Sequence, residues 1–368
     1  MVNHRGRQAI LALLVLLAVA GWTSPAIAGP LVIVPTYNFA CMPSKYTQCE
    51  VKCAFGKAAT QLGNEFCFVG RTPTVHFCVD WSSTALGSNK PNAFLFKYTP
   101  CFFHFCCGFC LKISCGIRCV MLRDYAARPT TITTQAAANL PATFGKCCIV
   151  ELTAANLTAL GFPQGCTSCG TIFFSDRNGG CGCINNCISF SFTPCSTPAG
   201  QFDFFGTAEH EMSEELGRIT FLACCPPPHL FTNCIFRFSA PGVRCDKAKG
   251  AGGKCVYLSV NNGTTSLVKF NGLTSGDLDD YKGCRLGNPC PCPACNPADP
   301  FNAFLSAGQT TTLSTVDLDN MEALGFELKP AVIPAPEIDP RTGRTASLLL
   351  LAALGLAESR RRRSASQA

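Results

Sequence analysis

The chain has no hydrophobic run long enough to cross a membrane as a helix. The apolar stretches near its two ends, Ala9 to Ala20 and Ala346 to Ala357, each have about a dozen residues, whereas a membrane-spanning helix needs about 20. The sequence also has no Gly-Lys-Ser/Thr phosphate loop and no Gly-x-Ser-x-Gly nucleophile elbow. We therefore expect no stable transmembrane span in the mature protein and neither of those two chemistries.

Charged residues are also few, at 14% of the chain, and their basic excess lies at the ends. The whole chain has 30 basic and 23 acidic side chains, but residues 1–28 and 331–368 hold eight of the basic and three of the acidic ones. The remaining 22 basic and 20 acidic side chains give a net charge of about +2. This balance argues against a nucleic-acid partner, which needs a basic surface.

The N-terminal end predicts export. Arg5 and Arg7 precede the first apolar run, and the small residues Ala26-Ile27-Ala28 precede Gly29. This order is typical of a cleaved signal peptide, which we assign to residues 1–28. A retained membrane anchor is the alternative interpretation.

The C-terminal end predicts a sorting signal. Pro336-Glu337 leads through a Pro-rich spacer to an apolar run that ends in Arg360–Arg363. This order resembles the PEP-CTERM sorting signal of exported bacterial proteins, although Ile338 follows where that signal has proline. We assign residues 331–368 to a spacer and sorting tail, and expect a secreted, cell-surface or matrix protein with the export and sorting machinery as partner. A frayed basic tail is the alternative.

All 28 cysteines lie between Cys41 and Cys295. In an exported protein this density predicts a framework of disulfides. The pairs Cys107-x-x-Cys110 and Cys166-x-x-Cys169 offer a metal knuckle or redox motif as an alternative, but no second suitably spaced pair completes a four-cysteine zinc site.

The pattern between the ends predicts a mixed α+β fold without long internal repeats. Strands are expected at Leu31–Val34 and Val75–Val79, and a hairpin from Val256–Val260 and Ser266–Phe270 around Asn261-Asn262-Gly263. Helices are expected over Thr133–Leu140, Thr153–Leu160, 206–220 and Asp317–Leu324, the last ending at Gly325 and the third stopped by Pro226–Pro228.

The helix over 206–220 carries the most informative motif, His210-Glu211-Met212-Ser213-Glu214. At 100° per residue, His210, Glu214 and Gly217 fall on one face. The apolar residues Ala208, Met212, Leu216 and Ile219 fall on the other. We expect the apolar face to pack on a core and the polar face to line a cleft, with Thr207 as N-cap.

Imidazole and carboxylate are both zinc ligands, and residues four apart on a helix are neighbours. His210 and Glu214 are therefore predicted to bind Zn²⁺, with Glu211 as the general base that takes a proton from metal-activated water. The competing interpretation is a solvated acidic helix face made of Glu209, Glu211, Glu214 and Glu215.

A catalytic zinc site needs a third protein ligand. Thr220 stands where the longer His-Glu-x-x-His-x-x-Gly-x-x-His pattern has its third histidine, and threonine is a poor ligand. His229 is the natural substitute; Cys224, Cys225 and Asp203 are further options. Asp277, Asp279 and Asp280 lack the spacing of a calcium loop and are interpreted as a solvated acidic turn.

Longer blocks resemble a known family. The helix with Leu216-Gly217-Arg218 is similar to the His-Glu-x-Ser/Thr-Glu-x-x-Gly-Arg signature of bacterial PEP-CTERM-associated zincin-like metalloproteases, which are distantly metzincin- or matrixin-like. Further similar blocks are Phe236–Arg244, Tyr257–Gly263, Asp299–Phe304 and Asp317–Gly325.

The resemblance implies a zincin-like domain over residues 29–330, with the similar blocks beginning near residue 75. It also implies a turn at Ser239–Gly242 beneath the site. The expected function is that of a secreted zinc-dependent peptidase acting on protein or peptide substrates. The alternative is a non-catalytic, disulfide-rich surface or matrix protein that retains a zincin scaffold.

Overall fold

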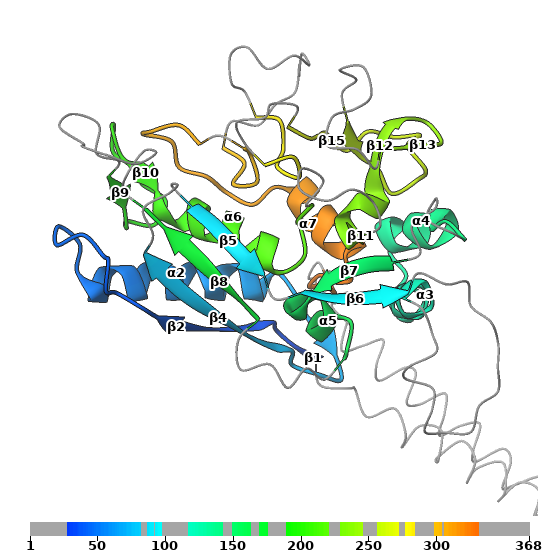
Figure 1. Ribbon diagram of the computed structural model, residues 1–368, viewed down its shortest axis with the longest axis horizontal. Coiled ribbons are helices and arrows are strands. Elements are labelled where there is room, and N and C mark those ends of the chain that lie inside the picture. The colour runs from blue at the N-terminus through cyan, green and yellow to red at the C-terminus, as the bar shows by residue number, and fades with distance from the viewer. Residues whose placement is uncertain are drawn as a thin grey trace, which may run out of the picture. The chain divides into compact units, whose positions relative to one another are not determined.

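The computed structural model describes residues 28–81, 87–91, 93–97, 117–142, 149–162, 169–175, 189–220, 229–245, 256–271, 277–283, 298–303 and 305–330. The chain divides into two units, residues 1–329 and 330–368. Residues 1–27 of the predicted signal peptide and the whole predicted tail lie outside the described residues. Helices and strands are mixed along the first unit (Figure 1), which confirms the predicted α+β class.

A four-stranded sheet forms one side of the core. Its order is β2 (Val32–Tyr37), β4 (Thr74–Trp81), β8 (Gly170–Phe174) and β5 (Gly87–Pro91). The first three strands are parallel and β5 is antiparallel to β8. Alternate residues of β4 are buried while those between them are half-buried, so one face of the sheet packs and the predicted strands at 31–34 and 75–79 are confirmed.

Two helices cover the same face of this sheet and pack against each other: α2 (Gln48–Asn64) and α6 (Phe204–Glu215). The ring of Phe174 in β8 lies 6.2 Å from that of Phe55 in α2 and 4.8 Å from that of Phe204 in α6. Aromatic packing therefore fixes α6, which carries the His-Glu motif, against the sheet.

Helix α2 was not expected from the sequence. Its start has a capping box: the Thr47 hydroxyl accepts a hydrogen bond from Glu50 N at 3.1 Å, and the Glu50 carboxylate accepts one from Thr47 N at 2.9 Å. Such reciprocal pairing satisfies two helix-end donors at once.

A second group of elements surrounds a three-stranded sheet of order β11 (His229–Phe231), β7 (Ile149–Thr153) and β6 (Ala93–Lys97). The helices of this group are α3 (Ile117–Ala127), α4 (Thr131–Asn139), α5 (Ala154–Ala159) and α7 (Thr315–Ala323), with the 3₁₀ helix η1 (Thr232–Phe236). Helices α4, α5 and α7 confirm the expected helices at 133–140, 153–160 and 317–324.

A small antiparallel sheet follows in the order β13 (Val243–Arg244), β12 (Arg237–Ala240), β14 (Tyr257–Leu258) and β15 (Val268–Lys269). Strands β14 and β15 form the predicted hairpin. Asn262 and Gly263 have φ values of +58° and +78°, as the central residues of a type I′ turn require. The remaining short strands are β1 (Ala28–Gly29), β3 (Phe68–Val69), β9 (Phe190–Ser191) and β10 (Phe202–Asp203).

The segment after α7 ties the elements together. Arg71, which follows β3, pairs with Glu327 at 3.0 Å. Asn156 of α5 donates its amide to Leu324 O at 2.6 Å, and Arg128 donates to Phe326 O at 3.1 Å. Residues 324–328 therefore close the unit by polar contacts to three distant parts of the chain.

The predicted disulfide framework is not seen at six described cysteines, which carry free thiols: Cys41, Cys49, Cys53, Cys67, Cys78 and Cys195. Cys119 of the described part is disulfide-bonded. Most of the other cysteines lie outside the described residues, so a disulfide framework stays a prediction for them. Within the described part, no helix combines the length and apolar character that crossing a membrane requires.

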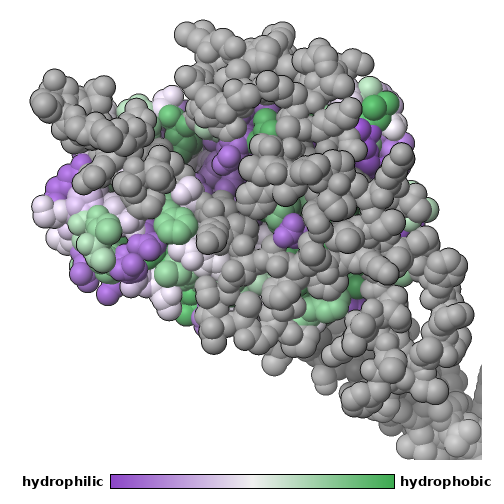
Figure 2. Space-filling view, viewed as in Figure 1, coloured by the Kyte–Doolittle hydropathy of each residue, from purple (hydrophilic) through white to green (hydrophobic). Residues whose placement is uncertain are grey.

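The surface of the described part carries few large hydrophobic side chains. On the face drawn in Figure 2, hydrophilic and hydrophobic residues are intermixed. Val69 and Val243 are the large hydrophobic residues recorded as exposed among the described ones. Single exposed residues of this kind are normal for a folded protein.

Candidate metal centre

Helix α6 begins at an N-cap, Asp203, that differs from the predicted one. The Asp203 side chain accepts from Phe205 N at 3.0 Å, and its other oxygen accepts from the backbone and hydroxyl of Thr311 at 2.9 and 3.0 Å. Thr207 lies inside the helix and donates its hydroxyl to Asp203 O, so its prediction as N-cap was wrong. The two oxygens of an aspartate side chain accept from several donors at once, which explains the earlier start. Asp203, weighed above as a metal ligand, caps the helix instead.

The helix ends at Glu215, earlier than predicted, in a Schellman motif. Gly217 N donates to Glu214 O at 2.9 Å and Arg218 N donates to Ser213 O at 3.1 Å. Gly217 has a φ of +117°, and a Cβ placed on it would lie 3.1 Å from the Asn156 side chain. Glycine is therefore required here, and the turn brings Arg218 back over the polar face of α6.

The predicted apolar face of α6 is confirmed, since Ala208, Met212 and Leu216 are fully buried and Ile219 nearly so. The polar face, however, does not line an open cleft as expected. Every residue from Phe204 to Glu215 is buried, because segments 277–283 and 298–303 contact that face.

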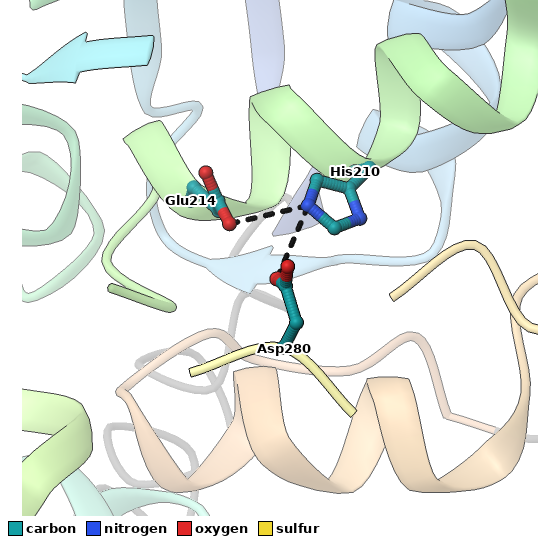
Figure 3. Close-up of side chains that lie close together, drawn as sticks. All are labelled: His210, Glu214 and Asp280. Carbon is teal, nitrogen blue, oxygen red and sulfur yellow. Dashed lines mark ion pairs between the residues drawn. The ribbon is translucent and has the colours of Figure 1, made fainter. Parts of the chain in front are cut away.

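Three side chains converge on the polar face. His210 Nε2 lies 3.2 Å from Glu214 Oε1 and 3.1 Å from Asp280 Oδ1. Figure 3 shows Asp280 pointing from its loop toward α6, where His210 and Glu214 stand one turn apart. Within the described part of the chain, this is the one group of three His, Cys, Asp or Glu side chains whose ligand atoms all lie within 4.8 Å of one another.

The other ring nitrogen of His210 is held by the backbone. Nδ1 lies 2.7 Å from Pro300 O, and because a carbonyl only accepts, Nδ1 donates. This bond fixes the ring orientation and directs Nε2 at the two carboxylates, as metal-ligating histidines require.

Arg218 contacts the same two carboxylate oxygens. Its Nη2 lies 3.3 Å from Glu214 Oε1 and its Nη1 lies 3.1 Å from Asp280 Oδ1. Nη1 also donates to Asp279 O at 3.2 Å, and the whole side chain is 0% exposed. Arg218 belongs to the sequence motif, but no role was predicted for it.

Asp279 and Asp280 are buried, at 2% and 3% exposed, so the interpretation as a solvated acidic turn was wrong for these two residues, whereas Asp277 is exposed. The Asp279 carboxylate accepts from Thr220 N at 3.0 Å. Thr220, at the position of the missing third histidine, thus anchors the loop whose next residue, Asp280, reaches the site.

The charges of this cluster are strongly coupled. Burial favours a neutral ring, but Asp280 and Glu214 outweigh it and hold the pKa of His210 well above its usual value. Burial raises the pKa of Glu214 to about 7 against the opposing effect of His210. Burial also acts on Asp280, but His210 and Arg218 outweigh it and lower its pKa to about 2. Above pH 7, where Glu214 is ionised, a protonated His210 and Arg218 then balance two carboxylates.

The donor set fits a zinc ion. Tetrahedral coordination with bonds of about 2.0–2.2 Å places ligand atoms about 3.3–3.6 Å apart. The two distances from His210 Nε2, 3.1 and 3.2 Å, come within a few tenths of an ångström of that spacing. One imidazole and two carboxylates, with the histidine fixed from behind by Pro300 O, are groups that hold such an ion.

The other candidates stand as follows. Glu211 follows His210 on α6 and is 4% exposed. His229 begins β11, where its backbone pairs with Ile149, but its side chain lies outside the described residues, as do Cys224 and Cys225. The turn after Ser239 forms as predicted between β12 and β13, but Pro241 and Gly242 are exposed and do not lie beneath the buried cluster.

No family model matches the chain, and neither a curated protein nor a solved structure does. Its function must therefore be inferred from the cluster formed by His210, Glu214 and Asp280.

Proposed function

We propose that this protein is an exported zinc-dependent peptidase in which His210, Glu214 and Asp280 hold Zn²⁺ and Glu211 is the general base. The observation that carries the proposal is the convergence of one histidine nitrogen and two carboxylate oxygens within 4.8 Å on the buried face of α6. Export, a zincin-like scaffold and a protein or peptide substrate belong to the same proposal, and rest on the sequence patterns described above.

The position of each residue indicates its proposed role. His210 and Glu214 lie one turn apart on α6, and Asp280 approaches from a loop 66 residues after Glu214. When bound, zinc lowers the pKa of a water molecule towards neutrality and polarises a carbonyl group. Glu211, next to His210, would be the base that takes up a proton and passes it to the leaving amine.

Burial suits this chemistry because charges interact more strongly away from water. Within the cluster, the His210 side chain is the most exposed at 11%, against 2% for Glu214 and 5% for Asp280. The approach of a substrate is therefore proposed to be over the imidazole edge of His210.

A second candidate function rests on the charge balance. Because His210 and Arg218 neutralise Glu214 and Asp280 without any added ion, the cluster is also suited to a structural role in a non-catalytic surface or matrix protein. Metal content separates the two candidates.

The test of metal binding uses protein purified after export. The peptidase proposal expects about one zinc per chain, lost in His210→Ala and kept in Glu50→Gln, which changes an exposed helix-capping glutamate. Absence of zinc from the wild-type chain, or equal zinc in His210→Ala, would refute zinc binding by this cluster and leave the structural role.

The test of catalysis uses Glu211→Gln and an unfolded protein as substrate. The variant should keep its zinc and lose cleavage, because the amide cannot accept the proton. Equal cleavage by wild type and variant would remove Glu211 from the mechanism while leaving the metal ligands in place.

A further inference from the structure

Arg218 is the most completely buried charge at the candidate metal centre. It is 0% exposed, and each nitrogen of its guanidinium group donates a hydrogen bond. Nη2 reaches Glu214 Oε1 at 3.3 Å and Nη1 reaches Asp280 Oδ1 at 3.1 Å. These are the same two oxygens that face His210 Nε2.

The third edge of the guanidinium leads back to His210. Arg218 Nε donates to Ser213 Oγ at 2.8 Å, and Ser213 Oγ donates to His210 O at 2.6 Å. The plane of the guanidinium also lies over the Phe301 ring, 4.4 Å from its centroid. Phe301 follows Pro300, whose carbonyl holds His210 Nδ1.

All three candidate ligands are thus tied to one side chain, directly or through one neighbour. We propose that Arg218 is a positioning residue that clamps Glu214 and Asp280 in the ligating arrangement before the metal ion binds. This inference rests on the proposed zinc function and assigns Arg218 a role in metal affinity that goes beyond holding the fold.

The physical reason lies in the repulsion between the two carboxylates. Buried like charges disfavour each other, and Asp280 belongs to a loop whose position no helix fixes. A rigid fork with donors on separate nitrogens holds two oxygens at a set spacing, which the single point charge of lysine does not. Pre-organisation of this kind reduces the free energy that ordering the ligands costs when the ion binds.

Arg128 provides a matched control. It pairs with Asp124 four residues earlier, as Arg218 pairs with Glu214, and also lies close to Glu322. It donates to Phe326 O and contacts none of the three candidate ligands in the described structure. Arg128→Lys therefore tests the general effect of shortening a partly buried arginine.

The experiment measures zinc affinity of the full chain by competition with a chelator, beside thermal unfolding of the metal-free protein. We expect Arg218→Lys to bind zinc about 10- to 100-fold more weakly, the range for outer partners of metal ligands. Arg128→Lys should stay within about twofold of wild type, since it leaves the ligands in place. In protein loaded with Co²⁺, the visible absorption band should shift in Arg218→Lys and not in Arg128→Lys.

Zinc affinity and Co²⁺ spectrum unchanged in Arg218→Lys, with zinc binding by wild type intact, would overturn this inference alone. Absence of zinc binding by wild type would overturn it together with the proposed function. If Arg218→Lys does not fold, Ser213→Ala decides in its place, because it removes one anchor of the guanidinium and leaves both ion pairs. It should weaken zinc binding about 3- to 10-fold, and an unchanged affinity would overturn the inference.

Discussion

The two faces of α6 are equally buried but are held by different forces. Phe204, Ala208 and Met212 pack on the sheet side, where the contacts are apolar and do not depend on a particular orientation of the groups. On the opposite side, His210 and Glu214 meet Arg218 and Asp280 through contacts of 3.1 to 3.3 Å. Burial alone therefore does not distinguish core from site; the pairing of polar atoms among α6, Arg218 and Asp280 does.

The largest expected effect breaks the apolar side. Phe204 packs its ring 4.7 to 5.3 Å from those of Phe174, Phe190 and Phe192. Phe204→Ala should lower the free energy of unfolding by about 3–5 kcal/mol because it leaves a cavity. Denaturant unfolding measures the loss. Protein that remains folded should keep its zinc affinity; a large loss of affinity without a loss of stability would contradict the division between the faces.

The next largest expected effect is a pH dependence of the free energy of unfolding, which arises from Glu209 of α6. Burial, with Asp203 and Glu65 nearby, raises the pKa of Glu209 from 4.5 to about 8. The native state then binds a proton that the unfolded state loses above pH 4.5. The stabilisation is complete below pH 4.5 and is lost as the pH rises to about 8. The total is a few kcal/mol at most, at about 1.4 kcal/mol per pKa unit.

Glu209→Gln should flatten this slope and exceed wild type in stability at pH 8. Urea unfolding at pH 5 and pH 8 provides the comparison, with Glu50→Gln as the exposed control, whose own carboxylate has a lowered pKa. Equal slopes in wild type and Glu209→Gln would show that Glu209 does not carry the effect.

A smaller effect, in binding rather than stability, breaks the polar side. Asp280→Asn keeps the shape of the side chain but removes the charge that faces His210 and Arg218. Zinc affinity should fall about 100-fold, equivalent to about 2.7 kcal/mol. Asp277→Asn, in the same loop but outside the cluster of three ligands, should change it little. Equal losses in the two variants would mean that the loop, and not the Asp280 oxygen, matters.

The smallest expected effect concerns the N-terminus of α6. Asp203→Ala removes the N-cap of α6 and should cost about 0.5–2 kcal/mol of stability. Thermal unfolding measures it, with Asp203→Asn as the control that keeps a capping oxygen. If the Asp203→Asn and Asp203→Ala variants are equally destabilised, the contacts of Asp203 with Thr311 contribute more to stability than its capping of the helix.

Much of the architecture could be predicted from local patterns. The period of the apolar residues predicted the packed face of α6, and the Asn-Gly turn predicted the β14–β15 hairpin. Gly325 predicted the end of α7. Helix α2 could have been found from Thr47-x-x-Glu50, because a threonine followed three residues later by glutamate is a helix-start signal.

The third candidate ligand could not be predicted in this way. Asp280 lies 66 residues after Glu214, and its loop looks solvated because three of four residues are acidic. Asp280 is buried against Arg218, and the neighbouring Asp279 accepts a hydrogen bond from Thr220 N, and both contacts exist only after folding. The available signal was the Gly217-Arg218 pair, because the residue after a helix-ending glycine often contacts the last turn of the helix.

The hydrogen bond between His210 Nδ1 and Pro300 O affects when, during synthesis of the chain, the candidate centre can form. The candidate centre needs α6, the loop at Asp280 and the carbonyl of Pro300, and that last segment is itself held by Ser314 through Asp299. A ribosome reaches these parts in order, so a chain shorter than about 315 residues cannot complete the arrangement. Whatever chemistry the centre performs is therefore withheld until nearly the whole first unit has been made and folded.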